Sequence, residues 1–156
     1  MTADVPSAEN DTECLPVACF SLTFQSGFPA VRAVLGQVDS FATVHDIPDP
    51  SRVSVQIVLA EALNNITEHA YRHAAGPITL SATFSTERFR IEILDKGVPL
   101  PTTLLDHAPV ATSEPFLGTP EEGGFGWPLI LQLTETLHYS RHGGQNRLKM
   151  TLKITV

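Results

Sequence analysis

Cysteine is scarce in this chain, and long apolar runs are missing. Cys14 and Cys19 are the only cysteines, too few for a disulfide framework, and no second thiol pair or nearby histidine completes a zinc site. We expect two reduced thiols, with a redox pair as the less favoured alternative. No apolar stretch approaches the roughly 20 residues of a membrane span, and residues 1–13 lack the basic and apolar regions of a signal peptide. These absences predict a soluble, cytoplasmic protein that does not enter a membrane.

Positive charge is also in short supply. The 156 residues include 10 Lys and Arg against 17 Asp and Glu, which gives a formal net charge of −7. This balance argues against a general polyanion-binding surface, so we expect no direct contact with nucleic acid. With 42% hydrophobic residues, the chain is long enough for one domain with a single core.

Two common nucleotide-binding motifs are absent as well. A P-loop ends in Gly-Lys followed by Ser or Thr, and no such sequence follows the glycines at 123, 124 and 126. These glycines also lack the spacing of the dinucleotide fingerprint. The string Gly124-x-Gly126 instead precedes a helical pattern, where glycines let the main chain approach a phosphate and unpaired N–H groups face the anion. It is a candidate phosphate clamp, and a plain glycine hinge explains it equally well.

Hydrophobic periodicity predicts one domain over residues 16–156, preceded by a flexible tail over residues 1–15. Strand patterns cover residues 17–24, 78–85, 88–95, 137–141 and 146–156, and helical patterns cover residues 29–43, 51–72 and 126–137. Ser51 is the expected N-cap of the second helix. Residues 97–123 contain five of the 12 prolines and no Lys or Arg, and we interpret them as a lid. The expected fold class is an α/β (α+β) two-layer sandwich, a mixed, mostly antiparallel sheet with about three helices on one face.

The second predicted helix carries the first chemical motif, Glu61-x-x-x-Asn65. Residues four apart lie on one helix face, within reach of one ligand. A carboxylate acts as a general base, and an amide oxygen is a hard, neutral ligand for Mg²⁺ that phosphates already hold. Taken alone, this spacing is more often a solvated helix face.

A second motif, Asp95-x-Gly97, follows the third strand pattern. A carboxylate at a strand end in an apolar cleft accepts a hydrogen bond from the exocyclic amine of adenine, and glycine lets the backbone turn sharply there. Asp and Gly also form ordinary turns, which is the better interpretation on local evidence alone. The order and spacing of all the motifs together favour a pocket for adenine, Mg²⁺ and phosphates.

The run Glu61-Ala-Leu-Asn-Asn65-Ile-Thr-Glu-His69-Ala-Tyr71 resembles the N-box of the GHKL ATPase superfamily, in the version found in bacterial anti-sigma-factor serine kinases. The resemblance covers most of the chain from about Val17, because the strands, the paired helices, the Asp-x-Gly box, the lid and the Gly-x-Gly box come in that family's order. It implies the Bergerat ATP-binding fold.

The resemblance also implies a role for each motif. Glu61 is then the general base of phosphoryl transfer, Asn65 the Mg²⁺ ligand, and Asp95 the adenine anchor supported by Gly97. Phosphoryl transfer depends on positioned positive charge, which the lid lacks. Gly124 and Gly126 are expected to close on the phosphates, and His69 to support Asn65 by hydrogen bonding. Lys96 and Arg141 are the basic side chains expected near the lid.

The implied function is that of an anti-sigma factor and ATP- and Mg²⁺-dependent serine/threonine protein kinase. Such a kinase phosphorylates a serine on a STAS-domain antagonist, and it sequesters a sigma factor until the unphosphorylated antagonist displaces it. The resemblance also implies a homodimer. The alternative is a nucleotide-dependent binding module that holds a regulatory partner without phosphoryl transfer. A third hypothesis is a scaffold that binds no nucleotide.

Overall fold

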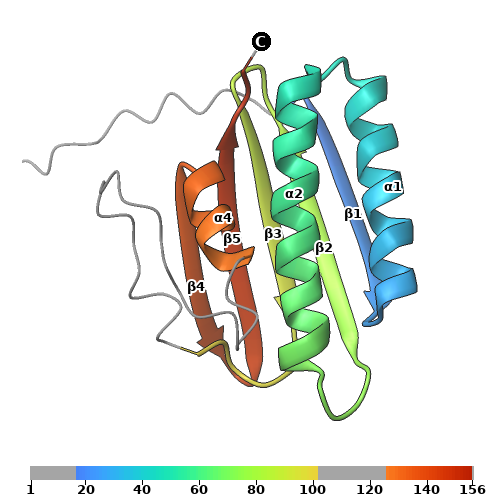
Figure 1. The fold of residues 1–156 in the computed structure, drawn as a ribbon, viewed down its shortest axis with the longest axis vertical. Helices are drawn as coiled ribbons and strands as arrows, with labels where there is room; N and C mark the ends of the chain where they lie inside the picture. The colour runs from blue at the N-terminus through green and yellow to red at the C-terminus, as the bar shows by residue number, and fades with distance from the viewer. Residues whose placement is uncertain (1–16, 102–125, 156) are drawn as a thin grey trace, which may run out of the picture.

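The computed structural model describes residues 17–101 and 126–155 (Figure 1). The expected tail over residues 1–15 lies outside these residues, and so do Gly124 and most of the expected lid over residues 97–123. None of the helices among the described residues is both long and apolar enough to cross a bilayer.

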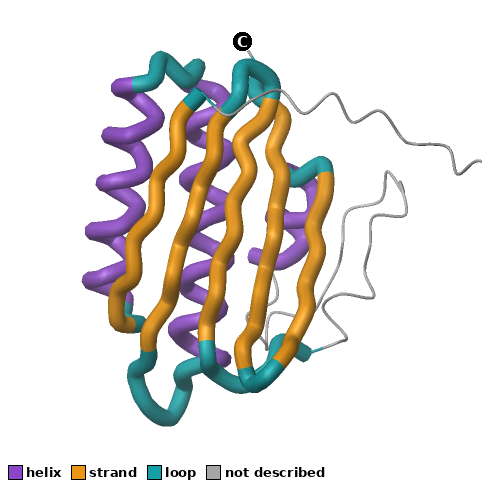
Figure 2. Tube along the Cα trace, turned by 180° about the vertical axis from the view of Figure 1, so that it is seen from behind, coloured by secondary structure: helices purple, strands orange, loops and turns teal. Residues whose placement is uncertain are grey.

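Five strands and three α-helices make up the described part of the chain. The strands are β1 (Ala18–Gln25), β2 (Pro77–Phe84), β3 (Arg88–Asp95), β4 (Thr136–His142) and β5 (Gln145–Lys153). The helices are α1 (Phe28–Val44), α2 (Asp49–Asn65) with the π-helical turn η1 (Ile66–Ala70), and α4 (Gly126–Leu133). The strands form one sheet of order β1-β2-β3-β5-β4, and the helices cover one face of it, leaving the other face bare in the described part (Figure 2). This is the expected α+β sandwich.

The expectation of a mixed sheet is wrong for the described strands, since every neighbouring pair is antiparallel. The reason lies in the connections. Hairpins join β2 to β3 and β4 to β5, while the chain leaves β1 through two successive helices and re-enters at β2. One crossover helix returns the chain parallel to the strand it left, whereas α1 and α2 together return it antiparallel.

The core fills the space between the sheet and the helices. In β2 and β3 every second residue is buried, as the predicted alternation requires, and Phe89, Ile91 and Ile93 of β3 point into the helix layer. α1 contributes a stripe of buried valines and one alanine, while α2 buries a broader face. Phe20 and Phe41, with ring centroids 5.5 Å apart, extend this core to the β1 edge.

The prediction of Ser51 as an N-cap is wrong. α2 begins at Asp49 after Pro48, and no side chain caps it. Ser51 is 3% exposed, and its hydroxyl donates to the carbonyl of Thr155 at 3.0 Å and accepts the Thr155 N–H at 2.7 Å. Ser51 therefore ties the first turn of α2 to the chain that follows β5.

Two helix ends also differ from the predictions. The helix expected over residues 51–72 changes to π-helical geometry at Ile66, and the Tyr71 N–H donates to the Ile66 carbonyl at 3.0 Å, one residue further than in an α-helix. The last helix ends at Leu133 rather than residue 137, because the Glu135 N–H already donates to Thr151 in the sheet at 2.7 Å.

Candidate functional site

A cavity lies between the end of α2, the η1 turn, the end of β3 and the start of α4. Its volume is about 30 Å³, room for water but far below the roughly 300–1,000 Å³ of small-molecule pockets. A larger ligand therefore enters only if part of the wall moves. The walls are mostly apolar, and the polar groups among the lining residues are Asn65, His69, Asp95, Tyr139, Asn146 and the indole of Trp127.

Asp95 lies at the end of β3 and is 5% exposed. Its Oδ1 accepts hydrogen bonds from the Gly97 N–H at 2.9 Å and from the Asn146 Nδ2 at 2.8 Å. Its Oδ2 receives no hydrogen bond from the described residues. Burial raises the pKa of Asp95, and the hydrogen bonds from Asn146 and Gly97 and the charge of Arg141 oppose that rise only partly. The carboxylate thus keeps one free acceptor at the cavity.

Gly97 is held against the η1 turn. A β-carbon on Gly97 would lie 2.5 Å from the Ala70 carbonyl oxygen, and the Val98 N–H donates to that same oxygen at 2.9 Å. Only glycine permits this approach without displacing the backbone. The π-helical turn and the residues of the Asp-x-Gly motif therefore contact each other directly beside the cavity.

Glu61 and Gly126 lie in contact although 65 positions separate them. A β-carbon on Gly126 would overlap the Glu61 carboxylate, so the first turn of α4 packs directly against that side chain. Glu61 is half-buried, one turn before Asn65, and it lies beside the cavity rather than among its lining residues. The structure thus brings the Glu-x-x-x-Asn motif to the only described glycine of the Gly-x-Gly motif.

His69 and Lys96 differ in their relation to the cavity. The exposed His69 side chain lines it, 3.8 Å from the Glu68 carboxylate, and makes no hydrogen bond to Asn65 among the described residues. Lys96 is exposed and does not line the cavity; its backbone N–H donates to the Tyr71 hydroxyl at 2.7 Å. No Lys or Arg side chain of residues 17–101 or 126–155 lines the cavity.

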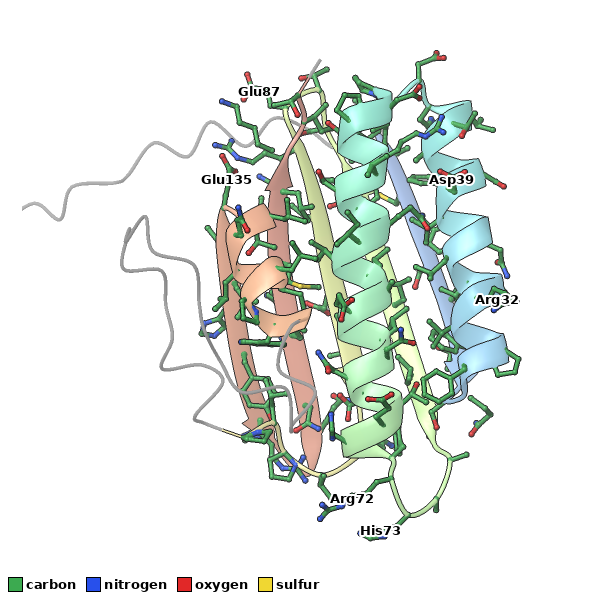
Figure 3. All side chains as sticks on the ribbon, viewed as in Figure 1. Arg32, Asp39, Arg72, His73, Glu87 and Glu135 are labelled. Atoms are coloured by element: carbon green, nitrogen blue, oxygen red, sulfur yellow. The ribbon has the colours of Figure 1, made fainter. Side chains whose placement is uncertain are left out.

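Tyr71 supports this end of the site. Its hydroxyl donates to the Pro77 carbonyl at 2.6 Å, and burial raises its pKa. A β-carbon on Gly76 would overlap the Tyr71 ring, so the glycine before β2 makes room for it. The loop residues Arg72 and His73, in contrast, lie at the edge of the molecule, and Glu87 and Glu135 lie at the opposite end of the sheet (Figure 3).

Sequence reasoning missed Asn146 and Tyr139 as cavity residues. The signal for Asn146 is its place in the alternation of β5, where Asn146 occupies a core-facing position otherwise taken by Leu148, Met150 and Leu152. A polar residue in a buried register position requires partners. Trp127 also lines the cavity; it is 4% exposed, and its Nε1 has no hydrogen-bond partner among the described residues.

The profile of the histidine kinase-like ATPase domain matches residues 25–152, most of the chain. The chain belongs to the histidine kinase-like ATPase family. The GHKL resemblance inferred from the N-box is thereby confirmed at the level of the family. No curated protein sequence matches the chain.

Several solved structures share the fold of this chain. The RsbU and RsbW domains of Rv1364c from Mycobacterium tuberculosis superpose with a TM-score of 0.62 at 15% identity, covering 90% of this chain and 34% of that one. The SiaB–SiaC complex of Pseudomonas aeruginosa gives a TM-score of 0.52 at 13% identity, covering 85% and 89%. A histidine kinase domain from Erythrobacter litoralis gives 0.50 at 19% identity, covering 80% and 61%. This chain spans about a third of the first structure, and these likenesses show the fold.

Proposed function

We propose that the protein is an ATP-dependent serine/threonine kinase and anti-sigma factor that acts by partner switching, phosphorylating a serine on a STAS-domain antagonist. The observation that carries the proposal is Asp95 Oδ2, which accepts no hydrogen bond from the described residues. It belongs to a cavity shared with Asn65, in a chain of the histidine kinase-like ATPase family. The fold likeness to a chain containing an RsbW domain supports the regulatory role. A homodimer and the sequestered sigma factor belong to the same proposal.

Asn65 is the side chain that fits a magnesium ion. Its amide oxygen is a neutral, hard ligand at the cavity. Among the described residues no group of three His, Cys, Asp or Glu side chains is placed to hold a metal without further ligands. This donor set fits an ion held mainly by phosphates and water, with the protein adding one oxygen. When bound, Mg-ATP supplies the activated phosphoryl group and the metal neutralises developing charge.

Glu61 is the proposed general base, which accepts the proton of the substrate serine hydroxyl. Its contact with Gly126 places it where α4 begins, beside the cavity. Val98–Pro101 and Trp127 form part of the wall of this cavity, whose volume of about 30 Å³ is too small for a nucleotide unless some of the wall moves.

One observation favours the alternative of a binding module that transfers no phosphate. Transfer depends on positive charge at the phosphates, and in the described part of the chain no cationic side chain lines the cavity. Arg141, which was expected to contribute positive charge, donates its Nη1 to the Gly97 carbonyl and to Asn146 Oδ1.

The experiment that tests the function incubates the protein with Mg-ATP and a STAS-domain antagonist and detects phosphoserine on the antagonist. Glu61→Gln should abolish phosphorylation while leaving Mg-ADP affinity within about twofold, and Glu87→Gln at the far end of the sheet is the matched control. Nucleotide binding without transfer to any antagonist selects the binding module. Absence of nucleotide binding rejects both.

A further inference from the structure

Asn146 joins the Asp95 carboxylate to the chain that follows it. The Asn146 side chain is 3% exposed, and its Nδ2 donates to Asp95 Oδ1 at 2.8 Å, to the Val98 carbonyl at 3.0 Å and to the Gly97 carbonyl at 3.3 Å. Asn146 faces Asp95 directly across the β3–β5 pair, which is why the two side chains meet. One amide therefore holds the end of β3 and the two residues after the Asp-x-Gly turn.

The opposite side of the same amide is equally occupied. Its Oδ1 accepts from the Tyr139 hydroxyl at 2.7 Å and from Arg141 Nη1 at 2.6 Å. The Tyr139 hydroxyl in turn accepts the Leu100 N–H at 3.0 Å, so the cluster also fixes the cavity wall at Leu100.

These partners permit only one orientation of the Asn146 amide. A guanidinium has no acceptor and must face the oxygen, whereas backbone carbonyls have no donor and must face the nitrogen. A flipped amide would oppose donor to donor at Arg141 and acceptor to acceptor at Val98 and Asp95. The Nδ2–H that faces Asp95 is thus enforced by three other groups, Arg141 and the carbonyls of Gly97 and Val98, and not by the carboxylate alone.

The consequence falls on the two oxygens of Asp95. Oδ1 is saturated by Asn146 and the Gly97 N–H, while Oδ2 has no partner among the described residues. The two oxygens of an ionised carboxylate are equivalent, so in either labelling one oxygen accepts both donors and the other is left for a ligand. We propose that Asn146 is a positioning residue for base selection: it locks Asp95 so that Oδ2 serves only as an acceptor, favouring a purine with an exocyclic amine over one with a carbonyl at that position. The inference rests on the proposed nucleotide site and adds its specificity.

Asn146 also supports the ionised form of Asp95, because its hydrogen bond is the largest contribution opposing the effect of burial on the Asp95 pKa. A protonated Asp95 donates as well as accepts, and so it tolerates the carbonyl of hypoxanthine. Loss of Asn146 should therefore reduce the preference for adenine over hypoxanthine, in addition to weakening nucleotide binding in general.

The test compares the affinities for Mg-ADP and Mg-IDP, whose bases differ in replacing the exocyclic amine by a carbonyl. Titration calorimetry on the full chain gives the ratio of the two Kd values for the wild type, Asn146→Leu, Tyr139→Phe and the control Ser140→Ala on the bare sheet face. We expect a wild-type preference for ADP of about tenfold or more. Asn146→Leu should reduce the ratio towards one, Tyr139→Phe should reduce it less, and Ser140→Ala should leave it unchanged.

A purely structural Asn146 would weaken both nucleotides by the same factor and leave the ratio intact, which overturns the inference while the nucleotide site stands. Equal wild-type affinity for ADP and IDP also overturns it. If the wild type binds neither nucleotide, the proposed function fails first and the inference falls with it. Circular dichroism checks folding, and if Asn146→Leu does not fold, the ratio for Tyr139→Phe decides the question.

Discussion

The carboxylate of Glu61 occupies the space that a β-carbon on Gly126 would fill. The two residues come from α2 and α4, which pack against each other, so the contact is set by tertiary structure rather than by a local motif. It places the proposed general base at the N-terminal turn of the helix that follows the Gly-x-Gly motif. Phosphates are commonly bound at such turns, where backbone N–H groups are unpaired.

Gly126→Ala should therefore displace Glu61. The displaced carboxylate is the end of a flexible, half-buried side chain, so it can swing aside at little cost in unfolding free energy. Phosphoryl transfer should fall more than Mg-ADP binding, because the proposed base moves. Urea unfolding and the phosphorylation assay measure the two effects. The matched control is Gly36→Ala, in the middle of α1 with open space around it, which should stabilise the protein by roughly 0.5–1 kcal/mol and leave transfer unchanged. Transfer as fast in Gly126→Ala as in the wild type would contradict the proposed role of the contact.

Trp127 offers a direct report on the cavity. It is the chain's single tryptophan, lines the cavity and is 4% exposed, and its Nε1 has no partner in the part of the chain that the structure describes. Because a nucleotide enters only if the wall moves, Mg-ADP should change the intensity or wavelength of Trp127 emission with saturation. Asp95→Asn should weaken this response at least about tenfold, since an amide cannot reproduce the acceptor pattern of the carboxylate. A saturable response of equal midpoint in Asp95→Asn would remove Asp95 from the base site.

Most of the fold follows from local patterns in the sequence. Strict alternation of apolar and polar residues predicts strands over residues 78–85 and 88–95, within one residue of the observed bounds of β2 and β3. The alternation also determines which side chains face the core, because a one-residue slip would bury the wrong face. The same alternation put Asp95 at a strand end. These features depend on neighbours within a few residues, and for this reason the sequence alone predicts them.

The missing parts depend on contacts between distant residues. Ser51 looked like an N-cap, but its partner is Thr155, and no local pattern records a pair 104 positions apart. The π-helical turn covers only Ile66–Ala70, too short a segment to stand out from α-helical periodicity in the sequence. Asn146 became a site residue only through the β3–β5 register.

The clasp between Ser51 and Thr155, meaning the two hydrogen bonds that the Ser51 hydroxyl makes with the Thr155 backbone, should contribute measurably to the free energy of unfolding. Ser51→Ala leaves the Thr155 N–H without its partner next to a buried position, and we expect a loss of about 1–2 kcal/mol. Ser54→Ala is the control, because Ser54 is on the same helix and bonds only the Pro50 carbonyl of its own helix. It should be neutral or slightly stabilising, since alanine is the better helix former. Equal losses in the two variants, measured by urea unfolding, would rule out the clasp.

Asp95 should impose opposite pH trends on stability and on base selection. Burial raises the pKa of Asp95 in the folded state above the unfolded value of 3.8. At a pH between the unfolded and folded pKa values, the native state therefore binds more protons than the unfolded state. This contribution to stability is full below 3.8 and is lost as the pH rises through the folded pKa. Discrimination against the hypoxanthine carbonyl needs the ionised form, because a protonated carboxyl also donates. The preference for Mg-ADP over Mg-IDP should therefore fall on acidification through the same window, by up to roughly tenfold per pH unit.

The comparison of the wild type with Asp95→Asn isolates Asp95, because protonation of the phosphates and of the adenine ring affects both proteins alike. Asp95→Asn has no carboxyl to titrate and should lose both trends, in urea unfolding and in calorimetry measured over the same pH series. If the stability difference between the wild type and Asp95→Asn does not change with pH, the raised pKa is wrong. If that difference changes and the nucleotide ratio does not, Asp95 is a buried acid of the fold that does not contact the base.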